Sequence, residues 1–235
     1  LIWLLTGNFG NKGGHFAPTS LVPIANFRSG HLPKTPVVGA PIISGLVPCN
    51  VITEEILTDH PNRYRAMIVE SGNPVHSLAD SENMRKALRS LECVVVIDIA
   101  MTETAKEADY VLPVANQFEK AESTFFNFEF PNNYVHLRHP VFEPPEGVLT
   151  EPEIHSRLVE ALGDMPTDEV ASLKKSLKLG KLAFIRKFQS IMRKRPNLRK
   201  LAPVILYRTL AAKLPEGLES GAVLWASAHP GPSIS

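Results

Sequence analysis

An α/β fold built around a parallel sheet is predicted by three features of residues 51–162. Apolar runs at 66–69, 94–97 and from Tyr110 onward show no polar alternation, as expected of strands covered on both faces. A helical pattern separates the first two runs. Gly, Pro, Asn or Asp residues follow the end of each run, where turns are expected.

The first two strands and the helix between them form a recognisable unit. The strand at 66–69 leads into the turn 71–74, and Asp80 or Ser81 is placed to cap the helix. Apolar residues recur in this helix at i, i+3, i+4 and i+7, namely Met84, Ala87, Leu88 and Leu91. Strand, helix and strand in about 30 residues predict a right-handed βαβ unit.

A third strand extends this unit. The segment VVVI ends at Asp98, Thr102 is expected to cap a short helix through Ala108, and YVLPVA begins the third strand at Tyr110. The sequence therefore predicts Rossmann-like architecture.

Three regions are expected within the 235 residues: a Gly- and Pro-rich loop segment at 1–50, the Rossmann-like domain at 51–162, and a helical, basic segment at 163–235. A net charge of +1 and a hydrophobic content of 44% describe an ordinary globular protein and favour no particular partner. The two cysteines, Cys49 and Cys93, have no metal-ligand spacing, and we expect both to be buried as small apolar residues.

The apolar runs of this sequence are short. No apolar run approaches the roughly 18 residues of a membrane-spanning helix. The start, LIWLLTGNFG, lacks an initiator Met and the layout of a signal peptide. We expect an internal piece of a longer, cytoplasmic polypeptide; a processed mature N-terminus and the periplasmic side remain the alternatives.

A ligand site is expected beyond the carboxyl ends of the strands, where open α/β sheets bind their ligands. The turn that contains Ser71, Gly72 and Asn73 follows one strand, and Asp98 to Thr102 follow the next. A carboxylate there can accept hydrogen bonds from ribose hydroxyls or from the N–H edge of guanine, and Gly72 allows close approach to the backbone. Asp98 could equally be an ordinary helix cap or turn acid. No GxGxxG fingerprint is present, which argues against a simple NAD site.

The order of several motifs resembles the molybdopterin oxidoreductases of the dimethyl sulfoxide reductase type, which include formate dehydrogenases and nitrate reductases. The pattern runs from SGNP through VVVID, TET and ADYVLP to FEKAES and an Asn, and LLTGNFGNKGG resembles the glycine-rich passage that precedes it. The resemblance covers residues 1–162.

This resemblance implies a cofactor and the residues that bind it. The family holds molybdenum or tungsten through two molybdopterin guanine dinucleotides. Ser71, Gly72 and Asn73 would line one guanosine-phosphate arm, Ile97 and Asp98 would hold the guanine or ribose, and Thr102 would support the same arm. Lys120 would lie near a pyranopterin or phosphate.

The resemblance also implies partners that lie outside this stretch of sequence. A 4Fe-4S cluster is expected in an N-terminal part and a further domain in a C-terminal part of the same enzyme, both acting as partners of this chain. The other expected partners are a small formate- or nitrate-like substrate and an electron-transfer subunit. After the Asn, the segment FEFPNNYVHLRHP departs from the family pattern and leaves the substrate side open.

Two other functions compete with an oxidoreductase that uses molybdopterin. The large subunit of respiratory NADH dehydrogenase is similar over these domains and would make this chain a non-catalytic, structural segment. A stand-alone nucleotide-binding module is the other alternative. The presence of Asn73, Asp98, Thr102 and Lys120 together favours the enzyme, in which this piece alone would be inactive.

The basic segment at 174–200 contains eleven Lys or Arg residues and no acid. We favour packing of this helix against another part of the enzyme, with its charges solvated. Contact with an anionic membrane or a partner is the second interpretation, and nucleic acid is the least favoured.

Overall fold

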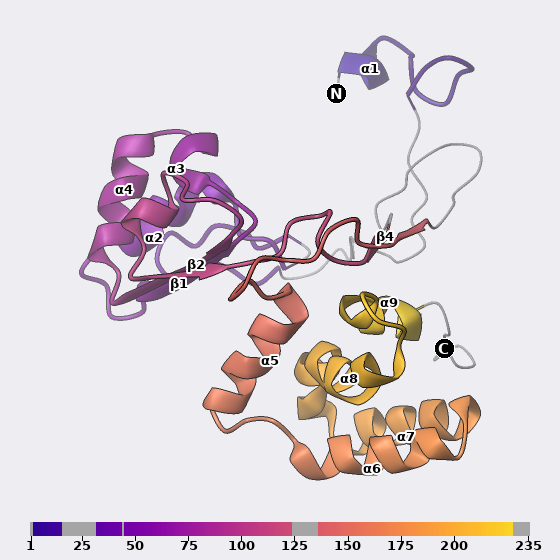
Figure 1. Cartoon of the computed structure of the whole chain (residues 1–235). Coiled ribbons are helices and arrows are strands. Elements are labelled where there is room, and N and C mark those ends of the chain that lie inside the picture. Colours follow the sequence, from indigo (N-terminus) through magenta and orange to yellow (C-terminus); the bar gives the residue numbers. More distant parts are fainter. Residues whose placement is uncertain (1, 16–31, 44, 124–135, 228–235) are drawn as a thin grey trace.

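The computed structural model describes residues 2–15, 32–43, 45–123 and 136–227 (Figure 1). The elements in chain order are α1 (Ile2–Leu5), η1 (Cys49–Val51), α2 (Ile52–Ile56), β1 (Ala66–Glu70), α3 (Pro74–Ser77), α4 (Ser81–Ser90), β2 (Cys93–Asp98), η2 (Ala105–Glu107), β3 (Tyr110–Pro113), β4 (Glu122–Ser123), β5 (Leu137–Arg138), α5 (Glu151–Ala161), α6 (Thr167–Lys178), α7 (Lys181–Lys194), η3 (Pro196–Leu201), α8 (Ala202–Leu210), η4 (Ala211–Lys213), η5 (Glu219–Gly221) and α9 (Ala222–Ser227). The α/β class predicted from the sequence is confirmed.

A parallel sheet with the order β1-β2-β3 lies at the centre of the N-terminal half. Val69 pairs with Val96, and Val96 pairs with Val111, so all three strands run in the same direction and end at one edge. The third strand is shorter than YVLPVA and ends at Pro113, which pairs with Asp98, the last residue of β2.

One face of the sheet is covered by α2 and α4, which lie beside it in Figure 1. Asp80 caps α4 as predicted: its carboxylate accepts a hydrogen bond from the Asn83 N–H at 3.1 Å. The helical spacing then turns Met84, Ala87 and Leu88 toward the sheet, where they are buried. The short helix expected to run from Thr102 to Ala108 is a single 3-10 turn, η2.

The opposite face of the sheet is covered only in part. Helix α5 covers the end near the strand tips, where Ile154 packs with Ile97 and Val114. Further back, Ile68 and Tyr110 flank Val95 in one cross-strand row, and both are more than half exposed. Since parallel sheets are normally covered on both faces, this row is a surface that the described part of the chain leaves open.

The C-terminal region is helical, as predicted, over its described residues. Helices α6 and α7 form an antiparallel hairpin that packs against α8, with Leu173, Phe184 and Ile205 in a common core. In Figure 1 these helices lie apart from the sheet and are joined to it by α5. None of the helices in the described ranges is long and apolar enough to cross a membrane.

The N-terminal segment contains loops and single turns over the residues that are described. Residues 32–43 are attached to the domain by Glu55, which accepts hydrogen bonds from the backbone N–H groups of Val37 and Val38 at 3.0 and 2.9 Å. The expectation that both cysteines are buried was wrong: Cys49 is exposed and Cys93 is half-buried. Cys49 begins a short surface turn, and Cys93 begins β2 on the partly open face of the sheet.

Candidate functional site

A pocket of about 590 Å³ opens at the edge where the parallel strands end. Five of the seven site residues predicted from the sequence line it, namely Ser71, Gly72, Asn73, Asp98 and Lys120. The lining also contains Ile99, Val114, Ala115, Asn116, Gln117, Phe118 and Glu151. A cavity of this volume suits a nucleotide-sized ligand.

The loop after β1 lines the pocket and has backbone donors that the described residues do not use. Ser71 has a φ of +53°, an unusual conformation for a residue with a side chain, and its N–H donates to the Ile97 carbonyl. The N–H groups of Gly72 and Asn73 donate to no other described residue. Two neighbouring backbone donors are therefore available to an anionic or carbonyl oxygen of a ligand.

Asn73 uses its side chain to join the two pocket loops. Its amide Nδ2 donates to Glu103 at 2.6 Å, and its Oδ1 accepts from the Thr104 hydroxyl at 2.7 Å and from the Thr104 N–H at 3.2 Å. The hydrogen bond from Asn73 holds the pKa of Glu103 below its ordinary value. Asn73 thus fixes the loop after β1 to the loop after β2, rather than offering a free amide to a ligand.

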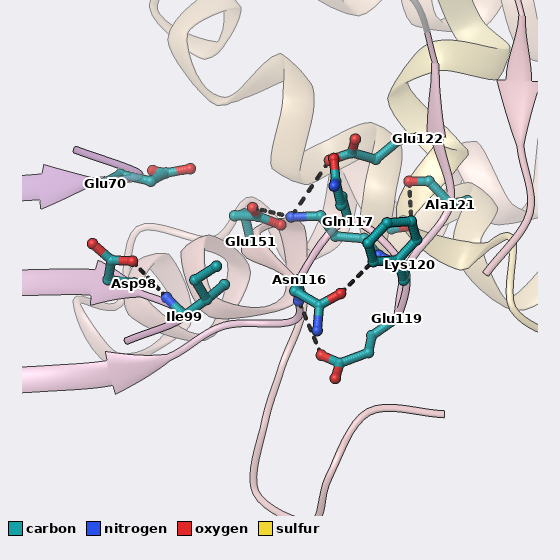
Figure 2. Close-up of polar contacts among 12 residues, drawn as sticks. Glu70, Asp98, Ile99, Asn116, Gln117, Glu119, Lys120, Ala121, Glu122 and Glu151 are labelled. Atoms are coloured by element: carbon teal, nitrogen blue, oxygen red, sulfur yellow. Dashed lines mark hydrogen bonds and ion pairs between the residues drawn. The ribbon is translucent and has the colours of Figure 1, made fainter. Parts of the chain in front are cut away.

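Asp98 is the last residue of β2 and lies at the strand tip (Figure 2). Its Oδ1 accepts a hydrogen bond from the Ile99 N–H at 2.7 Å. Among the described residues its other oxygen has no hydrogen-bond partner, so it can accept from a ligand in the pocket. Ile99 and Phe118, both exposed, line the pocket together with this carboxylate.

Lys120 lines the pocket, and its positive charge is balanced by neighbouring carboxylates. Its ammonium forms an ion pair with Glu151, the first residue of α5, and lies 3.7 Å from Glu122 (Figure 2). The side chain is only 10% exposed. Glu122 is also paired with Arg138 at 2.9 Å, so among the described residues Asp98 is the acid of this pocket lining that has no cationic partner. An unpaired carboxylate favours the N–H edge of a base over a phosphate.

Two predicted site residues lie outside the pocket lining. Ile97 is fully buried under α5, and Thr102 caps η2 by accepting from the Ala105 N–H at 3.2 Å. The segment that departs from the family pattern is 128–140, and its residues 128–135 lie outside the described residues.

Sequence reasoning missed Thr104 and Glu151. Thr104 is the second threonine of the quoted TET motif, and that motif was the available signal. No sequence signal connected Glu151 with Lys120. No group of three or more metal-ligating side chains occurs in the parts of the chain that the structure describes.

Comparison with known proteins matches a large part of this chain to a protein family. The family model described as molybdopterin oxidoreductase matches residues 2–161. A probable oxidoreductase of Bacillus subtilis, YyaE, is 33% identical over 110 residues, which are 47% of this chain and 16% of that protein. The F420-dependent formate dehydrogenase subunit alpha of Methanocaldococcus jannaschii is 38% identical over 109 residues, 46% of this chain and 16% of the relative.

More distant matches include a reductase and a solved structure. A trimethylamine-N-oxide reductase of Vibrio parahaemolyticus is 29% identical over 100 residues, 43% of this chain and 12% of that protein. The structure of acetylene hydratase from Pelobacter acetylenicus matches with a TM-score of 0.46 and 25% identity, covering 52% of this chain and 17% of that one.

These curated relatives are much longer than the stretch that matches them, since the chain covers 12 to 16% of their lengths. The family match nevertheless spans more than half of this chain and includes every pocket residue named above. The chain therefore belongs to the molybdopterin oxidoreductase family.

Proposed function

We propose that the region 51–162 binds one guanosine end of a molybdopterin guanine dinucleotide in an oxidoreductase, and that 163–235 connects it to further parts of that enzyme. The observation that supports this most directly is the pocket at the strand ends. Its lining combines a carboxylate with free acceptor capacity, two free backbone donors and exposed apolar side chains.

Asp98 is the residue proposed to recognise the base. Guanine presents N1–H and N2–H₂ donors on one edge, and a carboxylate accepts both in a bidentate manner. Ile99 and Phe118 would contact the faces of the purine. The negative charge around Asp98 attracts the N–H donors of guanine, and it repels a phosphate group at the same position.

The loop after β1 is proposed to bind the ribose or phosphate part. The N–H groups of Gly72 and Asn73 point to a ligand that brings oxygen acceptors close to the backbone. Thr104 and Asn73 would keep this loop in place, and Lys120 with Glu151 would fix the opposite wall. Thr102 supports the arm indirectly, through η2.

The cofactor proposed for the whole enzyme is molybdenum or tungsten held by two such dinucleotides. When bound, this group supplies two-electron redox chemistry to a small substrate, for which formate- or nitrate-like molecules are our proposal. The chain's own residues then bind and orient the dinucleotide. An iron–sulfur cluster and an electron-transfer subunit would exchange electrons from elsewhere in the enzyme.

Gly72→Ala in the full-length protein tests the close approach of ligand to backbone. A methyl group at Gly72 would meet its nearest atom, the Glu70 carbonyl oxygen, at 3.7 Å, so the fold tolerates it. We expect normal folding but a loss of most bound molybdenum and of the guanosine monophosphate released by acid hydrolysis. Gly221→Ala, which is equally tolerated and lies outside the pocket, is the matched control.

Asp98→Asn tests base recognition, since it keeps the size of the side chain and replaces one acceptor by a donor. Guanosine content should fall by about tenfold or more, as expected when a buried polar contact is mismatched. Glu70→Gln, at the neighbouring strand tip, should leave it unchanged because Glu70 pairs with His155 instead. Wild-type levels of metal and guanosine in both pocket variants would refute the proposed function.

A further inference from the structure

The hairpin of α6 and α7 presents a surface that the cofactor proposal does not use. All eleven Lys and Arg residues between 174 and 200 are exposed, and the stretch contains no acid. At the turn of the hairpin, Leu179 is 81% exposed and Leu182 is 68% exposed. The turn lies at the edge of the molecule in Figure 1.

Helical spacing places these side chains opposite the buried residue of each helix. In α7, Leu182, Arg186 and Arg193 follow one another at i, i+4 and i+11, roughly opposite the buried Phe184. Lys175 of α6 and Leu179, which directly follows the last residue of α6, are four residues apart on the side opposite the buried Leu173.

Folding of the hairpin does not need this side. The buried side chains of α6 and α7 already pack with α8. Lys175, Lys178, Arg186 and Arg193 form no salt bridge with any described residue.

We propose that the outward side of this hairpin, which we call the tip surface (Lys175, Lys178, Leu179, Leu182, Arg186 and Arg193), binds an anionic lipid bilayer. The two leucines would enter the interface between headgroups and acyl chains. The flanking cations would remain at the level of the lipid phosphates, with their aliphatic stems along the apolar layer.

The composition of the segment favours lipid over an acidic protein. Seven of the eleven cations in 174–200 are Lys, although the tip surface itself has two Lys and two Arg, and Lys is depleted in protein–protein interfaces. Polybasic segments rich in Lys and Arg are attracted to anionic leaflets without needing specific pairing geometry. The described helices include no membrane-spanning one, so this contact would be peripheral.

The test is co-sedimentation of the full-length protein with vesicles of phosphatidylcholine alone or mixed with phosphatidylglycerol. Binding should require phosphatidylglycerol and should weaken as salt rises from about 0.1 M to 1 M. The double variant Leu179→Ser with Leu182→Ser should bind at least tenfold more weakly, because both apolar insertions are lost. Lys178→Gln should weaken binding about fivefold.

Matched controls use side chains of similar exposure elsewhere. Leu162→Ser changes a leucine that is 75% exposed at the end of α5, and Lys86→Gln changes an exposed lysine of α4. Both should bind vesicles like the wild type.

Failure of the full-length protein to bind anionic vesicles would overturn the proposal. Equal loss of binding in the controls would do the same, since attraction would then not be specific to the tip surface. Salt-sensitive binding to an acidic protein with no affinity for vesicles would assign the surface to a protein partner and also reject it.

Discussion

At the scale of single residues, the pocket depends on side chains that hold other groups in place. The side chain of Asn73, which the sequence suggested as a ligand contact, forms its described hydrogen bonds with Glu103 and Thr104. Thr104 in turn accepts from the Val75 N–H at 3.1 Å and is fully buried. These contacts span about 30 positions of sequence and connect the loops after two different strands.

Thr104→Val is expected to loosen both pocket loops. Valine keeps the shape but leaves the Val75 N–H without an acceptor and removes one donor to Asn73, at a cost of about 1–3 kcal/mol. In the full-length protein, hydrogen exchange over residues 71–76 should accelerate and guanosine content should fall. Thr102→Val, which removes only the cap of η2, should cost about 1 kcal/mol or less. Equal effects of the two variants would contradict the role of Thr104.

At the scale of elements, short pieces are stabilised by polar groups from their neighbours. Helix α2 has only five residues and could not persist alone, yet Glu55 within it is fully buried and organises the residues 35–40. Burial raises the pKa of Glu55, but hydrogen bonds from the Thr35 side chain and from the Val38 and Val37 N–H groups outweigh this and lower the pKa from its ordinary value of 4.5. The charged carboxylate is therefore the form that the fold prefers.

Glu55→Gln is expected to detach the segment 35–40 in a pH-dependent way. Because the folded-state pKa is depressed, the stabilisation by Glu55 is complete above the unfolded pKa and is lost as pH falls through the folded pKa. At pH 7 the variant should lose about 1–3 kcal/mol of local protection, measured by hydrogen exchange of that segment against the wild type at the same pH. The difference should shrink in acid.

Glu54→Gln is the matched control, since Glu54 is the exposed neighbour in the same helix. It should change protection by less than about 0.5 kcal/mol. A loss in Glu55→Gln that stays the same at acidic pH would show that charge on Glu55 is not the cause.

At the scale of the whole molecule, α5 joins the sheet to the helical region. Its Ile154 packs on the sheet side, and Glu153 and Glu160 on its other side bind Arg208 of α8. Burial raises the pKa of Glu153, but hydrogen bonds from Arg208 and Arg157 hold it below its ordinary value. The domain boundary expected at 162 therefore lies directly after α5, a helix that packs against both neighbouring regions.

Arg208→Met is expected to weaken the joint between the two regions by about 2 kcal/mol, because it leaves the mostly buried Glu153 without its main partner. Arg157→Met removes a more exposed i, i+4 pair with the same Glu153 and should cost about 0.5 kcal/mol or less. The cost of each variant is measured by thermal unfolding and by hydrogen exchange of α5 and α8.

A second substitution tests whether the loss in Arg208→Met comes from the unpaired charge of Glu153. Glu153→Gln added to Arg208→Met should restore part of the loss, since removing both charges avoids an unpaired carboxylate. No recovery in the double variant would mean that the unpaired Glu153 carboxylate is not the source of the loss, which would leave the lost pair of Arg208 with Glu160 as its cause.

Local patterns were enough to predict the elements of the sheet region. The run at 66–69 became β1, Asp80 capped α4, and VVVID became β2 ending at Asp98. These predictions succeeded because strand formation in a covered parallel sheet and helix capping depend on residues that are near in sequence. The pocket edge also followed, because parallel strands end together.

The sequence by itself determined the α/β class, the position of the strand ends and the motifs that identify the family. Only the tertiary structure decided which side chains face the pocket and which support it: Asn73 with Thr104, and Lys120 with Glu151. It also decided that Leu179 and Leu182 stay exposed while Phe184 is buried. The physical reason is that hydrogen-bond partners and burial depend on groups distant in sequence, which folding brings within reach and which no local pattern specifies.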